Sequence, residues 1–259
     1  MIKVVLIGSG NLASHLSRAL IESPKADCVQ RISRNHTNKS YFDPSIPVIS
    51  ELSDLVDADI YVLAVNDDSI AKLSKNLKHL RGLVVHTSGT VAMSALDPSL
   101  RRGVLYPAQS FSLEKKIDFK KVPLVLETEN ENDYKLLSDL ASELSDIIYK
   151  LDSEGRQKLH VAAVFANNFS NYMFSCAEEL CKEAGISFDI LKPMILETAI
   201  KVQGLSPIES QTGPAKRNDQ QTIKRHIEQL EGDKKLIYKN ITDSIIKSFK
   251  IKEENGKKL

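Results

Sequence analysis

The 259-residue sequence lacks most features of membrane, secreted or metal-binding proteins. Its three cysteines, Cys28, Cys176 and Cys181, match no metal-ligand or redox spacing, so we expect reduced structural thiols and no bound metal. No apolar run approaches the roughly 20 residues of a transmembrane helix. The first residues read as a strand without the basic region of a signal peptide, so the cytoplasm is the expected location.

Excess charge of either sign is also missing. Lys and Arg number 35 against 34 Asp and Glu, which leaves a formal net charge of +1 at pH 7. Proteins that hold nucleic acid or membranes by bulk electrostatics carry a large basic excess, so neither partner is expected. Hydrophobic residues make up 42%, which is ordinary for a globular protein that buries a core.

The N-terminus carries a dinucleotide-binding pattern. Branched apolar residues at 2–7 predict a buried strand, which stops at a glycine turn and continues as an amphipathic helix. Gly8 permits the tight turn, Gly10 lets a diphosphate approach the backbone, and Ala13 keeps helix and strand close. Unpaired N–H groups at the helix start favour an anion. The predicted diphosphate ligands are Gly8, Gly10, Asn11 and Leu12.

The end of the second predicted strand favours NADP(H) over NAD(H). NAD-binding relatives place Asp or Glu about 20 residues after the glycines, where the carboxylate holds the ribose 2′-hydroxyl. Here the corresponding tip is Ser33-Arg34-Asn35, and the nearest acid, Asp27, lies at the other end of the strand. An arginine and a hydroxyl would bind a 2′-phosphate that a carboxylate would repel. A solvated loop arginine is the alternative reading of Arg34.

The order of elements predicts two domains. Strand and helix patterns alternate from residue 2 to about 150, which indicates an α/β fold with a doubly wound parallel sheet, the NADP-binding Rossmann domain of residues 1–150. Only helical patterns follow, so residues 151–250 are expected to form an all-helical substrate and dimerisation domain. The polar residues 251–259 read as a disordered tail.

Polar residues at strand ends are the first candidates for chemistry. Ligands of doubly wound sheets bind at the carboxyl ends of the strands, where Val65 and Asn66 follow one predicted strand and Ser88 follows the next. These residues are expected to border the nicotinamide, with Ser88 as a candidate catalytic residue. The Ser88 hydroxyl could equally cap the segment that follows it.

The helical half offers two further sets of candidates. His160 could deliver a proton as hydride arrives at the neighbouring carbon, with Asn168 as its polar partner, although a lone helical histidine is more often structural. His160 and Asn167 are seven residues apart and hence expected on one face. A second set could buttress a cleft between the domains, or could belong to a capped helix that only makes domain contacts: Arg217, Asp219 and His226.

Five motifs in this order resemble one bacterial protein family. They are Gly-x-Gly-Asn-x-Ala at 8–13, His-Thr-Ser-Gly at 86–89, Tyr-Pro at 106–107, His-x6-Asn-Asn at 160–168 and Thr-Gly-Pro-x-x-Arg-x-Asp at 212–219. The chain is similar, over about residues 1–245, to proteins that pair a Rossmann-like domain with a helical domain of unknown function and are described as NADP oxidoreductases of the deazaflavin-dependent type. Wider relatives are pyrroline-5-carboxylate reductase and the 6-phosphogluconate and hydroxyisobutyrate dehydrogenases. The resemblance implies an NADP(H)-binding domain, a helical dimerisation domain and a cleft between them.

The chain departs from these relatives at two positions. The hydroxyacid dehydrogenases use a Lys and an Asn four residues apart on the long helix, but Lys158 is followed by Ala162. The histidine usual before Pro107 is Tyr106, which removes one candidate proton donor. We therefore expect an NADP(H)-dependent oxidoreductase, in dimeric form, that acts on a small carbonyl, imine or hydroxy compound or on a deazaflavin. The alternative is a regulatory or scaffold protein that binds NADP(H) without turning it over.

Overall fold

The structure is a computed structural model that describes residues 1–33, 43–113 and 115–256. It divides into two compact units, residues 1–168 and residues 169–259. Each unit is described separately below. Within the described ranges, no helix combines the length and apolar composition needed to cross a membrane.

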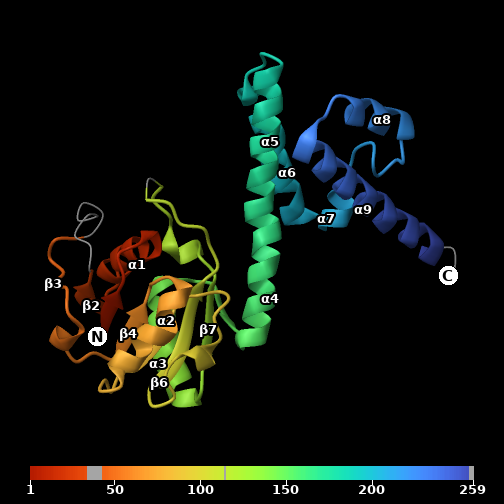
Figure 1. Cartoon of the computed structure of the whole chain (residues 1–259). Coiled ribbons are helices and arrows are strands. Elements are labelled where there is room, and N and C mark those ends of the chain that lie inside the picture. The colour runs from red at the N-terminus through yellow and green to blue at the C-terminus, as the bar shows by residue number, and fades with distance from the viewer. Residues whose placement is uncertain (34–42, 114, 257–259) are drawn as a thin grey trace. The chain divides into compact units, whose positions relative to one another are not determined.

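The first unit is built on one sheet with the strand order β3-β2-β1-β4-β5-β6-β7-β8 (Figure 1). The chain starts in the middle at β1, moves outward to β2 and β3, and returns to the other side of β1 as β4. This reversal creates a topological switch point at β1. The strands are β1 (Ile2–Ile7), β2 (Ala26–Ile32), β3 (Val48–Ile49), β4 (Ile60–Leu63), β5 (Leu83–His86), β6 (Arg101–Pro107), β7 (Leu124–Thr128) and β8 (Ile148–Lys150).

Helices cover both faces of this sheet, which confirms the doubly wound fold. On one face α1 (Asn11–Ile21) and α3 (Glu131–Leu144) pack leucine and alanine side chains against alternate strand residues. On the other face α2 (Asp67–Ser74) packs Ile70 against the intervening ones. Central strands such as β4 and β5 are buried at every position, as expected for parallel strands covered on both sides.

The sheet is not parallel throughout. β7 runs antiparallel to β6, and β8 is parallel to β7, whereas the sequence pattern predicted only parallel strands. Among its described residues, the β6–β7 connection contains a 3₁₀ turn at Phe119–Lys121 and no α-helix. Parallel strands are usually joined by a crossover helix, whereas antiparallel strands need none.

A long helical segment follows β8 and is interrupted once. It consists of α4 (Ser153–Ala163), a π-helical stretch at Val164–Phe169 and α5 (Ser170–Glu183). α4 belongs to the first unit, where Leu159 packs against the small cluster of Val104, Tyr106 and Val125. The sequence predicted a regular helix here and did not predict the π-turn, a feature frequent at functional sites.

The second unit contains only helices among its described residues. They are α5, a 3₁₀ helix at Phe188–Leu191, α6 (Lys192–Gly204), α7 (Pro207–Ser210), α8 (Gln220–Glu228) and α9 (Gly232–Gly256). α9 extends into the stretch expected to be a disordered tail. No residue of α5 or α6 is buried, and the buried apolar residues of the unit are Ala215, Ile223 and Leu230.

Candidate active site

The glycine turn after β1 is fixed by the strands on both sides of it. Gly8 has a φ of +146°, which L side chains rarely adopt, and a Cβ there would lie 2.1 Å from the carbonyl oxygen of Ala64. The Gly8 N–H donates to the carbonyl of Ile32, at the end of β2, over 3.1 Å. The turn therefore lies at the topological switch point, and only glycine fits at this position.

The start of α1 is open, as a phosphate site requires. Gly10 is the N-cap and provides no side-chain hydrogen bond to the first helical turn. A Cβ built on Gly10 would meet nothing within 4 Å, so a ligand can approach the backbone there. Together with the helix-start amides of Asn11 and Leu12, this geometry fits the diphosphate of a dinucleotide.

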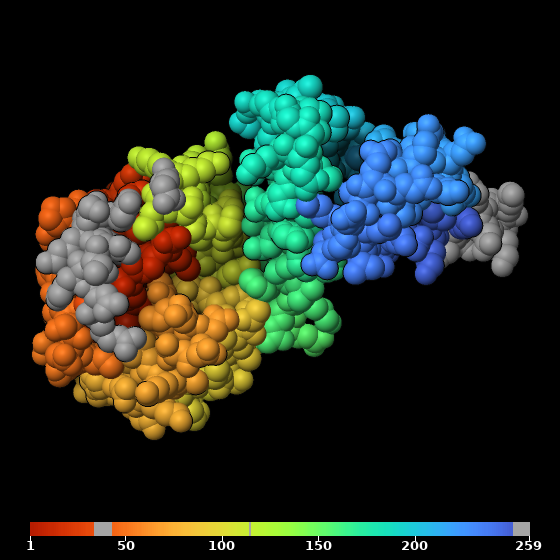
Figure 2. Space-filling model, turned by 45° about the horizontal axis from the view of Figure 1, so that its top comes forward, coloured from red at the N-terminus to blue at the C-terminus, as the bar shows by residue number. Residues whose placement is uncertain are grey.

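A segment after β6 forms a wall beside this helix start. The Asn11 side-chain amide donates to the carbonyl of Phe111 over 2.9 Å, and His15 Nε2 donates to the carbonyl of Ser112 over 2.9 Å. The rings of His15 and Phe111 lie 5.2 Å apart. In Figure 2, red atoms of the N-terminal segment reach the surface near yellow-green atoms of this region. The sequence analysis did not single out this wall.

The other expected cofactor residues are only partly described. Val65 and Asn66 follow β4 next to Ala64, and Asn66 is the N-cap residue of α2 without a side-chain capping bond. Ser33 is buried at the end of β2, and its N–H donates to the carbonyl of Ile49. Arg34 and Asn35 lie outside the described residues. The 2′-phosphate site therefore stays a prediction.

Ser88 is occupied by its own turn. Its hydroxyl oxygen accepts hydrogen bonds from the backbone N–H groups of Thr90 and Val91, over 3.1 and 3.0 Å. This is the capping role left open by the sequence. A catalytic role of Ser88 stays a prediction. The structure thus places Ser88 at the carboxyl edge of the sheet, as a residue that shapes the loop.

Arg156 connects this loop to α4. The guanidinium is fully buried and donates to the carbonyls of Ser88 and Val91, over 2.9 and 2.8 Å, and to Glu127 Oε2 over 3.0 Å. A buried charge needs partners of this kind, and removing Glu127 or Arg156 would leave the other charge uncompensated; only Nε of the guanidinium lacks a hydrogen-bond partner among the described residues. Nothing in the sequence pattern distinguished Arg156, because a single arginine on a helix normally reads as a solvated residue.

One turn further along α4, His160 meets Tyr106 of β6. The Tyr106 hydroxyl and His160 Nδ1 are 3.1 Å apart, and the two rings lie edge to face with centroids 6.0 Å apart. A Cβ on Gly89 would lie 2.5 Å from His160 Nδ1 and 2.9 Å from Tyr106 Cζ. Glycine at position 89 is therefore required for the two rings to approach the loop.

Strand direction explains why His160 reaches this place. Because β7 and β8 run opposite to β1–β6, the chain leaves β8 at Lys150 while it is moving away from the carboxyl edge of those strands. α4 then returns along the face formed by Val104 and Tyr106. The helix thereby carries His160 toward the edge where β5 and β6 end, the edge at which such sheets bind ligands.

The π-helical stretch changes which asparagine shares a face with His160. A π-turn takes one residue more than an α-turn, so the residue facing the same way as His160 shifts from seven to eight positions along the chain. Asn168 therefore takes the place that regular spacing assigned to Asn167. Both side chains are exposed.

His86 is a buried histidine of a different kind. It accepts a hydrogen bond from the Ser88 N–H at Nδ1, over 3.2 Å, and is fully buried. Burial, followed by the positive charge of Arg156, lowers the pKa of His86 from 6.5 to about 4. His86 is therefore neutral at physiological pH, and its Nδ1 holds the backbone of the loop that begins at Ser88.

In the second unit, the expected cleft residues surround the start of α8. Asp219 is its N-cap and accepts from the Thr222 N–H over 3.1 Å, a bond that lowers the pKa of the Asp219 carboxyl. His226 Nδ1 lies 2.8 Å from the Tyr238 hydroxyl, and Arg217 lies close enough to Asp219 to lower its pKa further. These contacts match the capped-helix alternative, and a role in a cleft stays a prediction.

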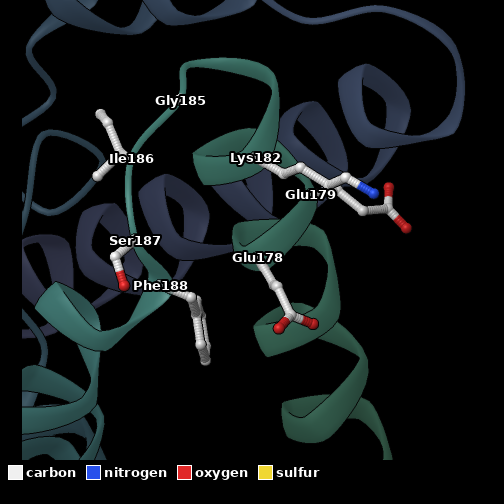
Figure 3. Close-up of a pocket in the computed structure, with 7 residues that line it drawn as sticks. All are labelled: Glu178, Glu179, Lys182, Gly185, Ile186, Ser187 and Phe188. Carbon is white, nitrogen blue, oxygen red and sulfur yellow. The ribbon is translucent and has the colours of Figure 1, made fainter.

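A hollow of about 620 Å³ lies at the end of α5 (Figure 3). Its side chains point in different directions, and Glu179 is paired with Lys234 over 2.9 Å. A binding site needs polar groups that converge, which this hollow lacks. The part of the chain that the structure describes also holds no group of three or more His, Cys, Asp or Glu side chains able to bind a metal.

Fold and site define a class, because a glycine turn at the switch point of a doubly wound sheet marks a Rossmann-type dinucleotide-binding protein. Residues 122–245 match the family model "Domain of unknown function (DUF2520)". The structure of a "putative NADP oxidoreductase" from Bacteroides fragilis shares 35% identity over 95% of this chain and 98% of its own, with a TM-score of 0.87. The chain belongs to the family of that protein, which confirms the expected resemblance.

More distant structures share the fold. Protein TM1727 of Thermotoga maritima is 20% identical over 96% of this chain and 99% of its own, with a TM-score of 0.74. A pyrroline carboxylate reductase of Plasmodium falciparum, solved with NADP bound, is 13% identical over 96% and 97%, with a TM-score of 0.63. No curated protein matches the sequence.

Proposed function

We propose that the protein is an NADP(H)-dependent oxidoreductase. The single observation that carries this proposal is the Gly8 turn, where the backbone of β1 meets Ala64 so closely that only glycine fits and α1 begins without a side-chain cap. Membership in the family of the Bacteroides fragilis protein supports the same activity. Bound NADPH would supply a hydride to the substrate carbon.

The chain's own residues have separate roles. The amides of Gly10, Asn11 and Leu12 hold the diphosphate, Ser33, Arg34 and Asn35 hold the 2′-phosphate, and Val65 and Asn66 border the nicotinamide. His160 gives the proton that the substrate oxygen or nitrogen needs when its carbon becomes reduced, with Asn168 as polar partner. The substrate class is a small carbonyl, imine or hydroxy compound, with a deazaflavin as a further candidate.

The cofactor assignment is tested by calorimetric titration with NADPH and NADH. Arg34→Glu should weaken NADPH binding at least tenfold and leave NADH nearly unchanged, because a carboxylate repels only the 2′-phosphate. Arg18→Glu, in the last turn of α1 and so away from the glycine turn, is the matched charge reversal and should change neither affinity. Equal loss for both nucleotides in Arg34→Glu would remove the NADP(H) preference.

The activity is tested by following NADPH oxidation with a panel of 2-ketoacids, cyclic imines and a deazaflavin. His160→Ala should abolish turnover of any active compound and keep NADPH affinity. The second candidate, a regulatory protein that binds NADP(H), is favoured by the absence of the Lys–Asn pair at Lys158 and Ala162. Tight NADPH binding with no oxidation by any compound would support that candidate.

We also propose that the second unit dimerises. Its helices expose many large apolar side chains, a pattern that marks an interaction surface. On α6, Met194, Leu196 and Ile200 are each more than half exposed. The double variant Met194→Lys, Ile200→Lys should halve the mass measured by light scattering, whereas Glu197→Lys on the same helix should not. A monomeric wild-type protein would overturn this proposal.

A further inference from the structure

Tyr106 and His160 form a pair whose two members differ in exposure. The tyrosine side chain is buried, with 7% of its surface exposed, while His160 is half-buried. Their polar contact uses the Nδ1 atom of the imidazole, 3.1 Å from the phenol oxygen. The other ring nitrogen, Nε2, is therefore the one that can meet a substrate.

The direction of this hydrogen bond follows from the surroundings of the phenol. Burial raises the pKa of Tyr106, so its hydroxyl keeps its proton at neutral pH. Within the described ranges, His160 Nδ1 is the one hydrogen-bond partner of this hydroxyl. Because a buried O–H without an acceptor is costly, the phenol donates to Nδ1, and the neutral imidazole then carries its own proton on Nε2.

Packing holds the pair in this arrangement. Gly89 leaves no room for a side chain beside either ring, and the loop that carries Gly89 is fixed by Arg156 through the carbonyls of Ser88 and Val91. The Arg156 guanidinium also acts on the phenol, since its positive charge favours the phenolate and partly offsets the effect of burial on the Tyr106 pKa.

We propose that Tyr106 is the proton source behind His160, and that the imidazole relays the proton to the substrate. The proposal rests on the role of His160 as proton donor. In the reduction, the hydride brings both electrons to the substrate carbon, and its oxygen or nitrogen takes the Nε2 proton. At the same time Nδ1 takes the phenol proton, so the imidazole stays neutral and Tyr106 becomes a phenolate. Solvent later restores the proton to the pair.

This relay gives the enzyme a distinctive pH dependence. An imidazolium acting alone would lose its proton as pH rises through the ordinary histidine pKa of about 6.5, and activity would fall with it. A neutral imidazole backed by a phenol keeps working above that pH. Among the described residues, the charged group that acts on Tyr106 is Arg156 on α4. Arg156 pairs with Glu127 on β7 and also acts on His86 of β5, whose pKa of about 4 keeps it neutral in this pH range.

The first test is the pH profile of kcat between pH 6 and 9, with the panel compound that is reduced fastest. Wild type should be level. In Tyr106→Phe, kcat should fall at least tenfold between pH 6 and pH 9, while NADPH affinity stays unchanged. Tyr61→Phe is the matched control, because Tyr61 is also buried and its hydroxyl bonds only to backbone, so its profile should stay level. Identical profiles for wild type and Tyr106→Phe would overturn the relay.

The second test needs no substrate. Nitrogen-15 NMR of the full-length protein at pH 8 should show His160 protonated on Nε2, with Nδ1 shifted as a hydrogen-bond acceptor. In Tyr106→Phe that shift should be lost. A spectrum with the proton on Nδ1 would overturn the proposal, whether or not any panel compound is reduced. If the NMR result is as expected but no compound is reduced, the proposed activity fails and the pairing stands.

Discussion

The two units use similar helices in opposite ways. In the first unit, α1 and α3 bury leucine and alanine side chains in a continuous core against the sheet. In the second unit, α5 and α6 bury no residue, and large apolar side chains on both are exposed. The difference teaches that apolar content alone does not make a core. The first unit has a sheet to supply the opposing surface, and α5 and α6 have no such layer among the described residues of their own unit.

The largest effect should come from the buried ion pair of the first unit. Arg156→Met removes the partner of Glu127 and leaves the carbonyls of Ser88 and Val91 without their donor. We expect the free energy of unfolding to fall by about 3–5 kcal/mol, measured by urea titration. Lys234→Met is the comparison in the second unit, where the carboxylates of Glu179 and Glu183 are well exposed. A loss there as large as that of Arg156→Met would contradict the comparison.

A pair of leucine truncations tests the comparison directly. Leu63→Ala on β4 opens a cavity at a fully buried position and should cost about 2–5 kcal/mol of unfolding free energy. Leu196→Ala on α6, where the side chain is 61% exposed, should cost less than about 0.5 kcal/mol in the monomer. If the second unit dimerises, the cost of Leu196→Ala should grow with protein concentration in the same titration.

Acid should act on the first unit through His86. The unfolded chain binds a proton on this residue below pH 6.5, but the folded state does so only near pH 4, so between these values the unfolded state holds more protons. The free energy of unfolding should therefore fall by about 3 kcal/mol as pH drops from 6.5 to 4. His86→Asn should lose this component of the pH dependence. If the free energy of unfolding of that variant fell with pH as steeply as in wild type, other groups would be the cause of the pH dependence.

The smallest effect concerns a strained residue in the second unit. Asn218 has a φ of +52°, in the left-handed region that asparagine and glycine tolerate best. Asn218→Ala should cost about 1 kcal/mol, and Asn218→Gly should cost less, as measured by thermal unfolding. If both variants behaved alike, backbone strain would not be the reason for asparagine at this position.

The sequence predicted the first unit better than the site, for physical reasons. Apolar runs and the Gly8 turn are local signals, and they correctly indicated a doubly wound sheet with helices on both faces. The direction of β7 was missed, because an apolar run predicts a strand and does not say which way it runs in the sheet. Arg156 became visible only when β5, β7 and α4 were brought together, and Tyr106, which the sequence marked only as a lost histidine, gained its partner there. Both depend on contacts between residues about 50 or more positions apart.

The length of α4 sets where His160 lies along the sheet. Each residue after Ser153 advances the helix by about 1.5 Å. His160 contacts the Tyr106 hydroxyl because the number of residues from Ser153 to His160 brings the imidazole to the right height. Substitutions on the outer side of α4 leave that count intact. A deletion of one helical turn would draw the imidazole back by about 5.4 Å, beyond the reach of Tyr106. The number of residues between Ser153 and His160 thus sets the Tyr106–His160 contact together with the two side chains that make it.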